Sequence, residues 1–280
     1  MPSLTLWDII SSPVTIRAFT VGALVSLCLA VMGVILVLKR YAMIGHGLGE
    51  IGFASTALAA LIGLQGYSLI ISIPLVCLTS ILIMYFDRKS SMGGDVFIGI
   101  FSTTALAVGV ILGRFSTGYS MESGMFGSIM GVSRGYMISV IALCAVILAV
   151  FALLYTRLFA VTFDETYARA TEMKTDLLQF IISLLTSVAV VLGMRVLGAM
   201  MISSFIIFPA LTARRVAASF RGMILVSALS ALISFSAGMA LSILSQLGAH
   251  PLPVGACVVV ASLALMLLSM ALPQRSRKRQ

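Results

Sequence analysis

Residues 135–156 read GYMISVIALCAVILAVFALLYT and contain no charged side chain. An α-helix needs about 20 apolar residues to cross the ~30 Å hydrocarbon core of a bilayer, so this run is long enough to span one. Seven further charge-free stretches follow the same pattern, at residues 18–38, 51–86, 96–113, 177–194, 196–213, 222–249 and 251–274. Because all of them are continuously apolar, they predict membrane-spanning helices and not the alternating strands of a membrane barrel.

The number of spans follows from the lengths of these runs. Residues 51–86 are too many for one span and carry Gly63 and Gly66 near their middle, so we interpret them as the end of one span, a turn and a second span. The pattern thus predicts an all-α polytopic membrane protein with about 8–9 transmembrane helices and a single domain over residues 1–280. The expected spans are residues 16–38, 44–64, 68–86, 95–113, 135–156, 176–194, 198–216, 222–246 and 252–272.

The basic side chains are sorted between the two sides of these spans. If each run crosses in turn, 14 of the 18 Lys and Arg residues fall on one side. They are Lys39, Arg40, Arg88, Lys89, Arg157, Arg169, Lys174, Arg214, Arg215, Arg221, Arg275, Arg277, Lys278 and Arg279. Positive residues concentrate in the cytoplasmic loops of inner-membrane proteins, so we place this side, and the C-terminus with it, in the cytoplasm.

The composition excludes an ordinary globular domain, because 60% of the residues are hydrophobic, 10% are charged and the mean hydropathy is +1.16. The net charge of +9 would suit nucleic acid, but the positive residues lie at membrane boundaries and no nucleic-acid-binding motif accompanies them. We expect the basic tail at residues 273–280 to lie in the cytoplasm near anionic membrane lipid. Residues 1–15 are expected to form an interfacial segment, not a removable signal peptide.

Two segments between the spans are too polar to cross a membrane. Residues 114–134, RFSTGYSMESGMFGSIMGVSR, are expected on the outer side. Residues 156–176, TRLFAVTFDETYARATEMKTD, are expected on the cytoplasmic side, where Asp164 is placed to cap a short helix.

His46 and Glu50 are the ionisable pair that lies well inside an expected span. Their i, i+4 spacing puts both side chains on one face of a helix. Ionisable groups at membrane depth are costly and usually line a cavity or a pathway, and an imidazole with a carboxylate suits zinc or manganese. One pair supplies two ligands, whereas a two-fold dimer would supply the four that a tetrahedral site needs.

Other interpretations of this pair stay open on the residues alone. His46 and Glu50 can form a hydrogen-bonded pair that holds helices together without metal, or can lie near the cytoplasmic interface, since Lys39 and Arg40 are a few residues away. If the pair does bind metal, His46 ligates as a neutral imidazole and Glu50 as a carboxylate. Transport should then weaken as the pH falls, because protons compete with the metal for the imidazole.

The remaining motifs predict no catalytic site and no permanently bound cofactor. Residues 47–52 match G-x-G-x-x-G, but the strand that a dinucleotide site requires is missing. Gly45, Gly49 and Gly52 instead recur at helical spacing, and we expect them to pack this helix closely at a dimer axis. The four cysteines lie far apart inside expected spans and are interpreted as small apolar helix residues.

Four stretches resemble the membrane permease subunit of the zinc/manganese/iron branch of ABC importers, and the similarity runs from about Gly22 to Ala261. They are LVLKRYAMIG at residues 36–45, FGSI at residues 126–129, FDETYARA at residues 163–170 and GAMMISSFIIFPA at residues 198–210. The resemblance implies a homodimeric or paired permease in a bacterial plasma (inner) membrane. It also implies an ABC ATPase subunit that hydrolyses the ATP, and an extracytoplasmic metal-binding protein that delivers zinc, manganese or iron.

The resemblance also assigns roles to residues. It makes His46 and Glu50 the metal-contacting residues, and it makes residues 163–176 the helix that couples the permease to the ATPase. The residues expected at this coupling contact are Phe163, Asp164, Glu165, Tyr167, Ala168 and Arg169.

The chain departs from the family pattern at two places. Where the family has Gly-Asp-x-Leu-Ser-His, residues 45–50 read GHGLGE, so the acid and the imidazole have exchanged places. Glu172 stands where a glycine is usual, and we expect a longer or differently ended coupling helix. Two rival functions stay open. An ABC permease for an organic ligand such as a metal chelate or a vitamin would have the same architecture, whereas a secondary metal transporter would need acidic or histidine residues in several spans, and this chain has few.

Overall fold

The computed structural model describes residues 12–89, 94–116, 120–127, 133–245 and 252–271. In these ranges the chain forms twelve α-helices, two short 3-10 helices and no strand, which confirms the all-α prediction. The basic tail, most of the expected interfacial segment, His250 and part of the FGSI stretch lie outside the described residues.

The helices follow one another with short connections. The α-helices are α2 (Pro13–Leu38), α3 (Ile44–Leu61), α4 (Ser68–Lys89), α5 (Gly94–Phe115), α6 (Met121–Phe126), α7 (Arg134–Leu153), α8 (Tyr155–Phe163), α9 (Glu165–Ala170), α10 (Thr175–Leu197), α11 (Ile202–Val216), α12 (Phe220–Ser245) and α13 (Val254–Ala271). The 3-10 helices are η1 (Gln65–Tyr67) and η3 (Ala199–Met201). Pro13 starts α2, one residue after its N-cap Ser12, so the last residues of the expected interfacial segment belong to the first span.

Seven helices are long and apolar enough to cross a membrane, by length and composition, within the described ranges. They are α2, α4 with η1, α5, α7, α10, α12 and α13. Two further expected spans also form helices but fall short of these limits. α3 holds His46, Glu50 and several glycines in 18 residues, and α11 has only 15 residues. The prediction of a membrane protein is confirmed, whereas the exact number of crossings stays a prediction.

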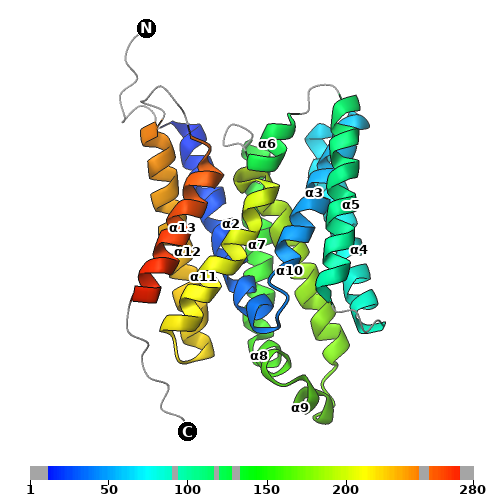
Figure 1. The fold of residues 1–280 in the computed structure, drawn as a ribbon, viewed down its shortest axis with the longest axis vertical. Helices are drawn as coiled ribbons and strands as arrows, with labels where there is room; N and C mark the ends of the chain where they lie inside the picture. Colours follow the sequence, from blue (N-terminus) through cyan, green and yellow to red (C-terminus); the bar gives the residue numbers. More distant parts are fainter. Residues whose placement is uncertain (1–11, 90–93, 117–119, 128–132, 246–251, 272–280) are drawn as a thin grey trace.

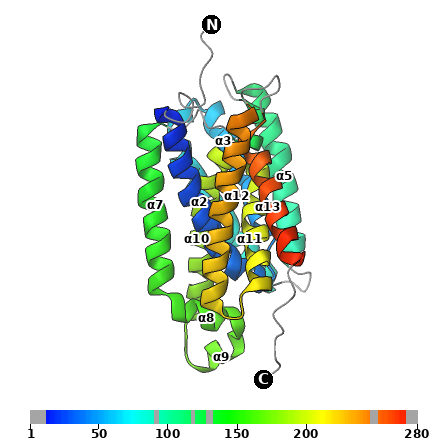
Figure 2. The same cartoon turned by 90° about the vertical axis from the view of Figure 1, so that its left-hand side faces the viewer.

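The helices pack around α2 and α10, the two spans with the largest buried share. Figures 1 and 2 show α11, α12 and α13 gathered beside α2, while α3, α4 and α5 form the opposite flank and α10 stands between the two groups. α7 packs on the outside of α2. The short helices α8 and α9 lie at one end of the bundle, and α6 lies at the other (Figure 1).

Three glycines let α3 approach the helices of its own chain. Gly45, Gly49 and Gly52 face α11, η3 and α10, and a Cβ on Gly49 would lie 2.5 Å from the carbonyl oxygen of Ala199. A Cβ on Gly45 would meet the end of the Ile206 side chain. The expectation that these glycines pack at a dimer axis is therefore wrong. Their missing side chains are needed inside one chain, where α3 passes close to backbone.

The connection between α10 and α11 is buried inside the bundle. Gly198 has φ of 88° and faces Gly127 at the end of α6, which has φ of 79°, and a Cβ on either would meet the backbone of the other segment. Val196 and Leu197 are buried as well. Residues 195–197 still belong to α10, so the connection consists of Gly198 and η3, and α6 covers it. Both glycines adopt the left-handed region that side chains disfavour, which allows the two backbones to touch.

The four cysteine thiols are free and buried in helices, as expected for small apolar helix residues. Cys28 in α2 and Cys144 in α7 lie near one another, because the Cys28 thiol is 3.9 Å from the Cys144 carbonyl oxygen.

Candidate metal site and coupling segment

The candidate metal pair lies in the first two turns of α3. The chain reaches α3 through a short turn after α2, and Ile44 begins the helix with its backbone N–H bonded to the Tyr41 carbonyl oxygen at 3.1 Å. His46 and Glu50 then follow one helical turn apart. Their side chains meet as the spacing predicted, with His46 Nε2 at 3.4 Å from Glu50 Oε1.

Glu50 is a buried carboxylate with an unused oxygen. Its side chain is 8% exposed, whereas that of His46 is 34% exposed. Glu50 Oε2 has no hydrogen-bond partner among the described residues. The contact to His46 is longer than the 2.7–3.2 Å of an ordinary N–H···O hydrogen bond. Burying a charged oxygen without a partner is costly, and the described residues leave Glu50 Oε2 unsatisfied.

The surroundings of the pair are formed by small residues and interrupted helices. On one side of α3, Gly49 touches the backbone of η3, where the helical path between α10 and α11 is broken. On the other side, Gly47 lies against Ile98 and Ser102 of α5. Interrupted helices inside a membrane expose backbone groups, and transport proteins use them near their ion sites.

The pair offers few ligands by itself. His46 supplies one nitrogen and Glu50 two oxygens, and no group of three or more His, Cys, Asp or Glu side chains gathers in the described part of the chain. Zinc is normally held by four ligands. A four-coordinate metal would therefore need ligands beyond these two side chains. The His46 side chain is partly exposed, so further ligands can approach from its side.

The expected coupling segment consists of two short helices. α8 is followed by Asp164, whose carboxylate accepts a hydrogen bond from the Tyr167 backbone N–H at 2.8 Å and caps α9 as predicted. Phe163 and Tyr167 are 55% and 61% exposed, whereas Ala168 is buried against the bundle. The segment thus presents two exposed aromatic side chains, and the buried Ala168 packs it against the bundle.

α9 ends where the sequence departs from the family pattern. The Met173 backbone N–H bonds to the Ala168 carbonyl oxygen and the Glu172 N–H bonds to that of Arg169, both at 3.1 Å. These two bonds form the Schellman motif, in which Glu172 takes the left-handed position that glycine normally fills, with φ of 57°. The expectation of a longer helix is therefore wrong, because α9 ends at Ala170 even without the glycine.

Glu165 points back toward the bundle. Its Oε1 accepts a hydrogen bond from the Arg169 guanidinium at 2.8 Å, and its Oε2 accepts one from the Gln179 amide of α10 at 2.6 Å. Lys39 Nζ, at the end of α2, lies 3.8 Å from the same Oε2. Sequence reasoning treated Lys39 only as a topology marker, because nothing in the spacing of residues 39, 165 and 179 indicates that they meet.

The fold and the site together are those of a polytopic membrane protein: a bundle of apolar helices buries the Glu50 carboxylate, places the partly exposed His46 imidazole beside it and carries a polar helical segment at one end. A family model described as the ABC 3 transport family matches residues 11–273. The chain therefore belongs to the ABC 3 transport family, and the resemblance to metal ABC permeases is confirmed.

Relatives agree with this assignment. The manganese transport system membrane protein MntC of Halalkalibacterium halodurans is 26% identical over 255 residues, which cover 90% of this chain and 85% of that protein. The high-affinity zinc uptake system membrane protein ZnuB of Haemophilus influenzae is 24% identical over 255 residues, which cover 90% of this chain and 95% of that protein.

Among solved structures, a chain of PsaBC from Streptococcus pneumoniae, determined in complex with Fab, superimposes with a TM-score of 0.86. The two chains are 23% identical, and the match covers 98% of this chain and 97% of that one. The fold is therefore shared over almost the whole length.

Proposed function

We propose that this chain is the permease subunit of an ATP-driven importer for a divalent transition metal, with zinc the preferred cargo and manganese or iron the next candidates. The chain lies in a bacterial inner membrane with its C-terminus in the cytoplasm. It works with a separate ABC ATPase at the α8–α9 end, an extracytoplasmic metal-binding protein at the α6 end and a second permease copy.

The observation that carries this proposal is the unused oxygen of Glu50. A carboxylate that is 8% exposed, beside an imidazole at 3.4 Å, combines an oxygen and a nitrogen ligand with no other partner for Oε2 among the described residues. A divalent cation would satisfy that oxygen and offset the cost of burying the charge. The names of the relatives, which include manganese and zinc transport proteins, support a metal as cargo.

The residues of the chain have separate tasks in this mechanism. Neutral His46 and ionised Glu50 hold the metal transiently while the pathway between two permease copies changes from outward to inward access. Two copies would contribute two imidazoles and two carboxylates, which is enough for a four-coordinate site. Phe163 and Tyr167, the exposed aromatic residues of the coupling segment, contact the ATPase. ATP hydrolysis belongs to that partner, so this chain is not itself an enzyme.

Uptake in proteoliposomes tests the proposal. Vesicles contain this chain, its ATPase and its binding protein, and radioactive zinc or manganese uptake is compared for wild type, His46→Ala and Glu50→Ala. We expect both variants to lose uptake while the complex still assembles. Asp95→Asn, an exposed carboxylate at the start of α5, is the control and should transport normally.

Three results would contradict the proposal. Normal metal uptake by both variants would make the pair structural. Transport of a metal chelate but not of the free ion by wild type would favour the organic-ligand permease, and uptake without ATP would favour a secondary transporter.

A further inference from the structure

The turn between α2 and α3, residues 39–43, is fixed to its surroundings at two points. Lys39 approaches Glu165 of the coupling segment at 3.8 Å. Two residues later, the Tyr41 hydroxyl donates a hydrogen bond to the Asp87 carboxylate near the end of α4. The turn therefore connects the coupling segment to the flank of the bundle that holds α3.

The turn itself is stiff. The Tyr41 N–H bonds to the Leu36 carbonyl oxygen at 2.8 Å and the Arg40 N–H to that of Val37 at 3.3 Å, which makes a Schellman motif with Arg40 in the left-handed position, at φ of 66°. A side chain in this region costs about 1–2 kcal/mol, so the surrounding contacts must hold it there. His46 follows directly, with its N–H bonded to the Met43 carbonyl oxygen at 3.1 Å. Because hydrogen bonds fix the backbone from Lys39 to His46, a displacement of Lys39 should also displace His46.

Glu165 is the residue at which the separate elements meet. Its carboxylate is shared by Arg169 of the same short helix, by Gln179 of α10 and by Lys39. Lys39 is 10% exposed at its side chain, so its ammonium group is enclosed and not free in solvent. The Glu165 side chain is 35% exposed, so solvent screens the contact in part, but the enclosed ammonium group makes the attraction stronger than that between two exposed charges.

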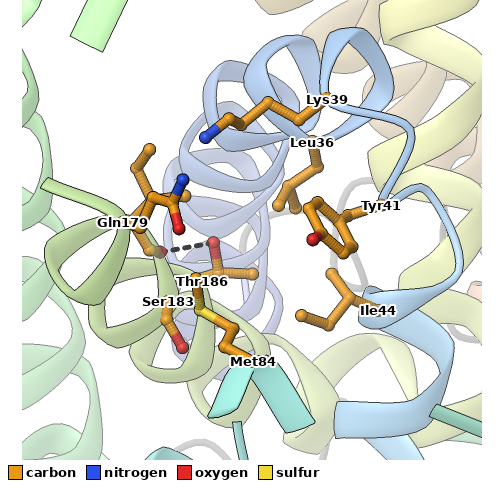
Figure 3. A pocket seen from close by; sticks show the side chains of 9 residues that line it. Leu36, Lys39, Tyr41, Ile44, Met84, Gln179, Ser183 and Thr186 are labelled. Atoms are coloured by element: carbon orange, nitrogen blue, oxygen red, sulfur yellow. Dashed lines mark hydrogen bonds between the residues drawn. The ribbon is translucent and has the colours of Figure 1, made fainter. Parts of the chain in front are cut away.

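The Lys39 side chain borders a small internal cavity. Figure 3 shows its ammonium group pointing toward Gln179 across the cavity, with Tyr41 and Ile44 on the opposite wall. The cavity has a volume of about 20 Å³, room for about one water molecule. The Lys39 side chain is therefore not fully packed on the side that faces the cavity.

We propose that Glu165 and Lys39 are positioning residues that transmit ATPase movement to the metal pair through the α2–α3 turn. Glu165 thus faces the permease itself, and the ATPase contact falls to its exposed neighbours. When the ATPase moves α8 and α9, Glu165 carries Lys39 with it, the turn follows as a unit, and His46 changes its place relative to Glu50. This inference rests on the proposed function, because it assigns the energy-transmitting path for the same site.

A labelling experiment tests the path without requiring metal. Met43, at the N-cap of α3, is 46% exposed, and the four native cysteines are buried, so Met43→Cys provides one accessible thiol. Its maleimide labelling rate is measured in the reconstituted complex with and without trapped ATP. The wild-type background should show an ATP-dependent change of rate that falls by at least about fivefold in Glu165→Gln and in Lys39→Met, the lower end of typical coupling between sites.

Metal-stimulated ATP hydrolysis is measured in parallel on the same complexes, with zinc ions and the binding protein. Glu165→Gln and Lys39→Met should lower the stimulation, and the double variant should be no worse than the more affected single variant, because both act through one contact. The matched controls at the same end of the bundle, Asp95→Asn and Lys89→Met, should behave as wild type.

The outcomes separate the two proposals. An ATP-dependent change in labelling that Glu165→Gln abolishes, in a complex that does not transport metal, would support the path and contradict the proposed function. Unchanged labelling and stimulation in assembled Glu165→Gln and Lys39→Met complexes would overturn the path. Losses that multiply in the double variant, or a labelling rate that never responds to ATP, would overturn it too.

Discussion

Glu50 and His46 differ in burial, and the exchanged order still leaves an imidazole and a carboxylate side by side. The imidazole occupies the more exposed position and the carboxylate the buried one, on one face of α3. A divalent cation needs both groups near each other but not in a fixed sequence order, because an i, i+4 pair meets in either direction. The exchange puts the negative charge deeper in the helix, where it attracts a cation strongly and is costly without one.

Replacing Glu50 by Gln tests whether Glu50 is a metal ligand or a structural hydrogen-bond partner. Gln keeps the shape of the side chain but removes the buried charge, whose Oε2 has no described partner. We expect the metal-free protein to keep its stability or to gain about 1 kcal/mol, since an unsatisfied buried polar group costs about 1–3 kcal/mol. The increase in unfolding temperature caused by zinc should disappear. Thermal unfolding of the detergent-solubilised protein, followed by circular dichroism with and without zinc, measures both effects.

A structural role for Glu50 predicts the reverse. Glu50→Gln would then lower the stability of the metal-free protein, and zinc would shift the unfolding temperature of wild type and variant equally. Asp95→Asn, which changes an exposed carboxylate, serves as the reference for a loss of charge alone.

At the scale of the helix, α3 depends on how closely it can pass η3 and α11. The contacts of two of its glycines differ in kind. A Cβ on Gly49 would press on the Ala199 backbone oxygen at 2.5 Å, whereas a Cβ on Gly45 would meet only the flexible end of Ile206. A side chain can change its rotamer to make room, but the backbone cannot. A Cβ added at Gly49 therefore has a larger effect than a Cβ added at Gly45, one helical turn away.

Alanine at these two positions should therefore have unequal effects. Gly49→Ala should reduce the yield of folded, detergent-stable protein severely, because α3 must move away from η3. Gly45→Ala should cost about 1–3 kcal/mol, the usual range for an overpacked core, since Ile206 can repack. Gly99→Ala, where a Cβ would meet nothing within 4 Å, is the control. Size-exclusion profiles and unfolding temperatures rank the variants, and equal behaviour of Gly45→Ala and Gly49→Ala would contradict this packing.

Two helices end with a residue other than glycine in the left-handed conformation. Arg40 ends α2 and Glu172 ends α9 in the left-handed conformation that favours glycine. Both positions lie in segments that we propose for coupling, the α2–α3 turn and the end of α9. A residue other than glycine makes each turn stiffer, and a stiff turn transmits a displacement better than a flexible one.

At the scale of the whole molecule, the His46–Glu50 pair offers fewer side chains than the four ligands that zinc normally takes. The described residues bring His46 and Glu50 together but add no third His, Cys, Asp or Glu to them. The two-fold dimer that we propose would supply further ligands, because the same patch would serve both copies. The partly exposed imidazole gives each copy a group that can reach a shared site.

The ratio of bound metal to protein tests this arrangement. We expect the purified complex, equilibrated with zinc, to contain two permease chains and one bound zinc ion, measured by light scattering and by elemental analysis of the same peak. His46→Ala should remove the metal without changing the number of chains. One metal per chain, or a monomeric permease that retains its zinc, would contradict a shared site.

Much of the architecture is predictable because membrane helices must satisfy two local conditions. Each needs a long apolar run, and its backbone must bond within itself, so charge-free stretches such as residues 135–156 identify spans directly. The same local logic predicted the cap at Asp164 and the meeting of His46 with Glu50, since both depend on spacing within one helix.

The remaining features depend on contacts between residues far apart in the chain. The burial of the turn at Gly198 follows from α6, which folds over it, and the glycines of α3 follow from η3 and α11 of the same chain. Lys39 meets Glu165 only because α2 and α9 end at the same side of the bundle. Sequence by itself determined the class of protein, most of the helices and the meeting of His46 with Glu50, because these arise from hydrophobicity and helical period. Tertiary structure alone decided which side chains of different helices meet, because packing brings them together and spacing along the chain does not encode it.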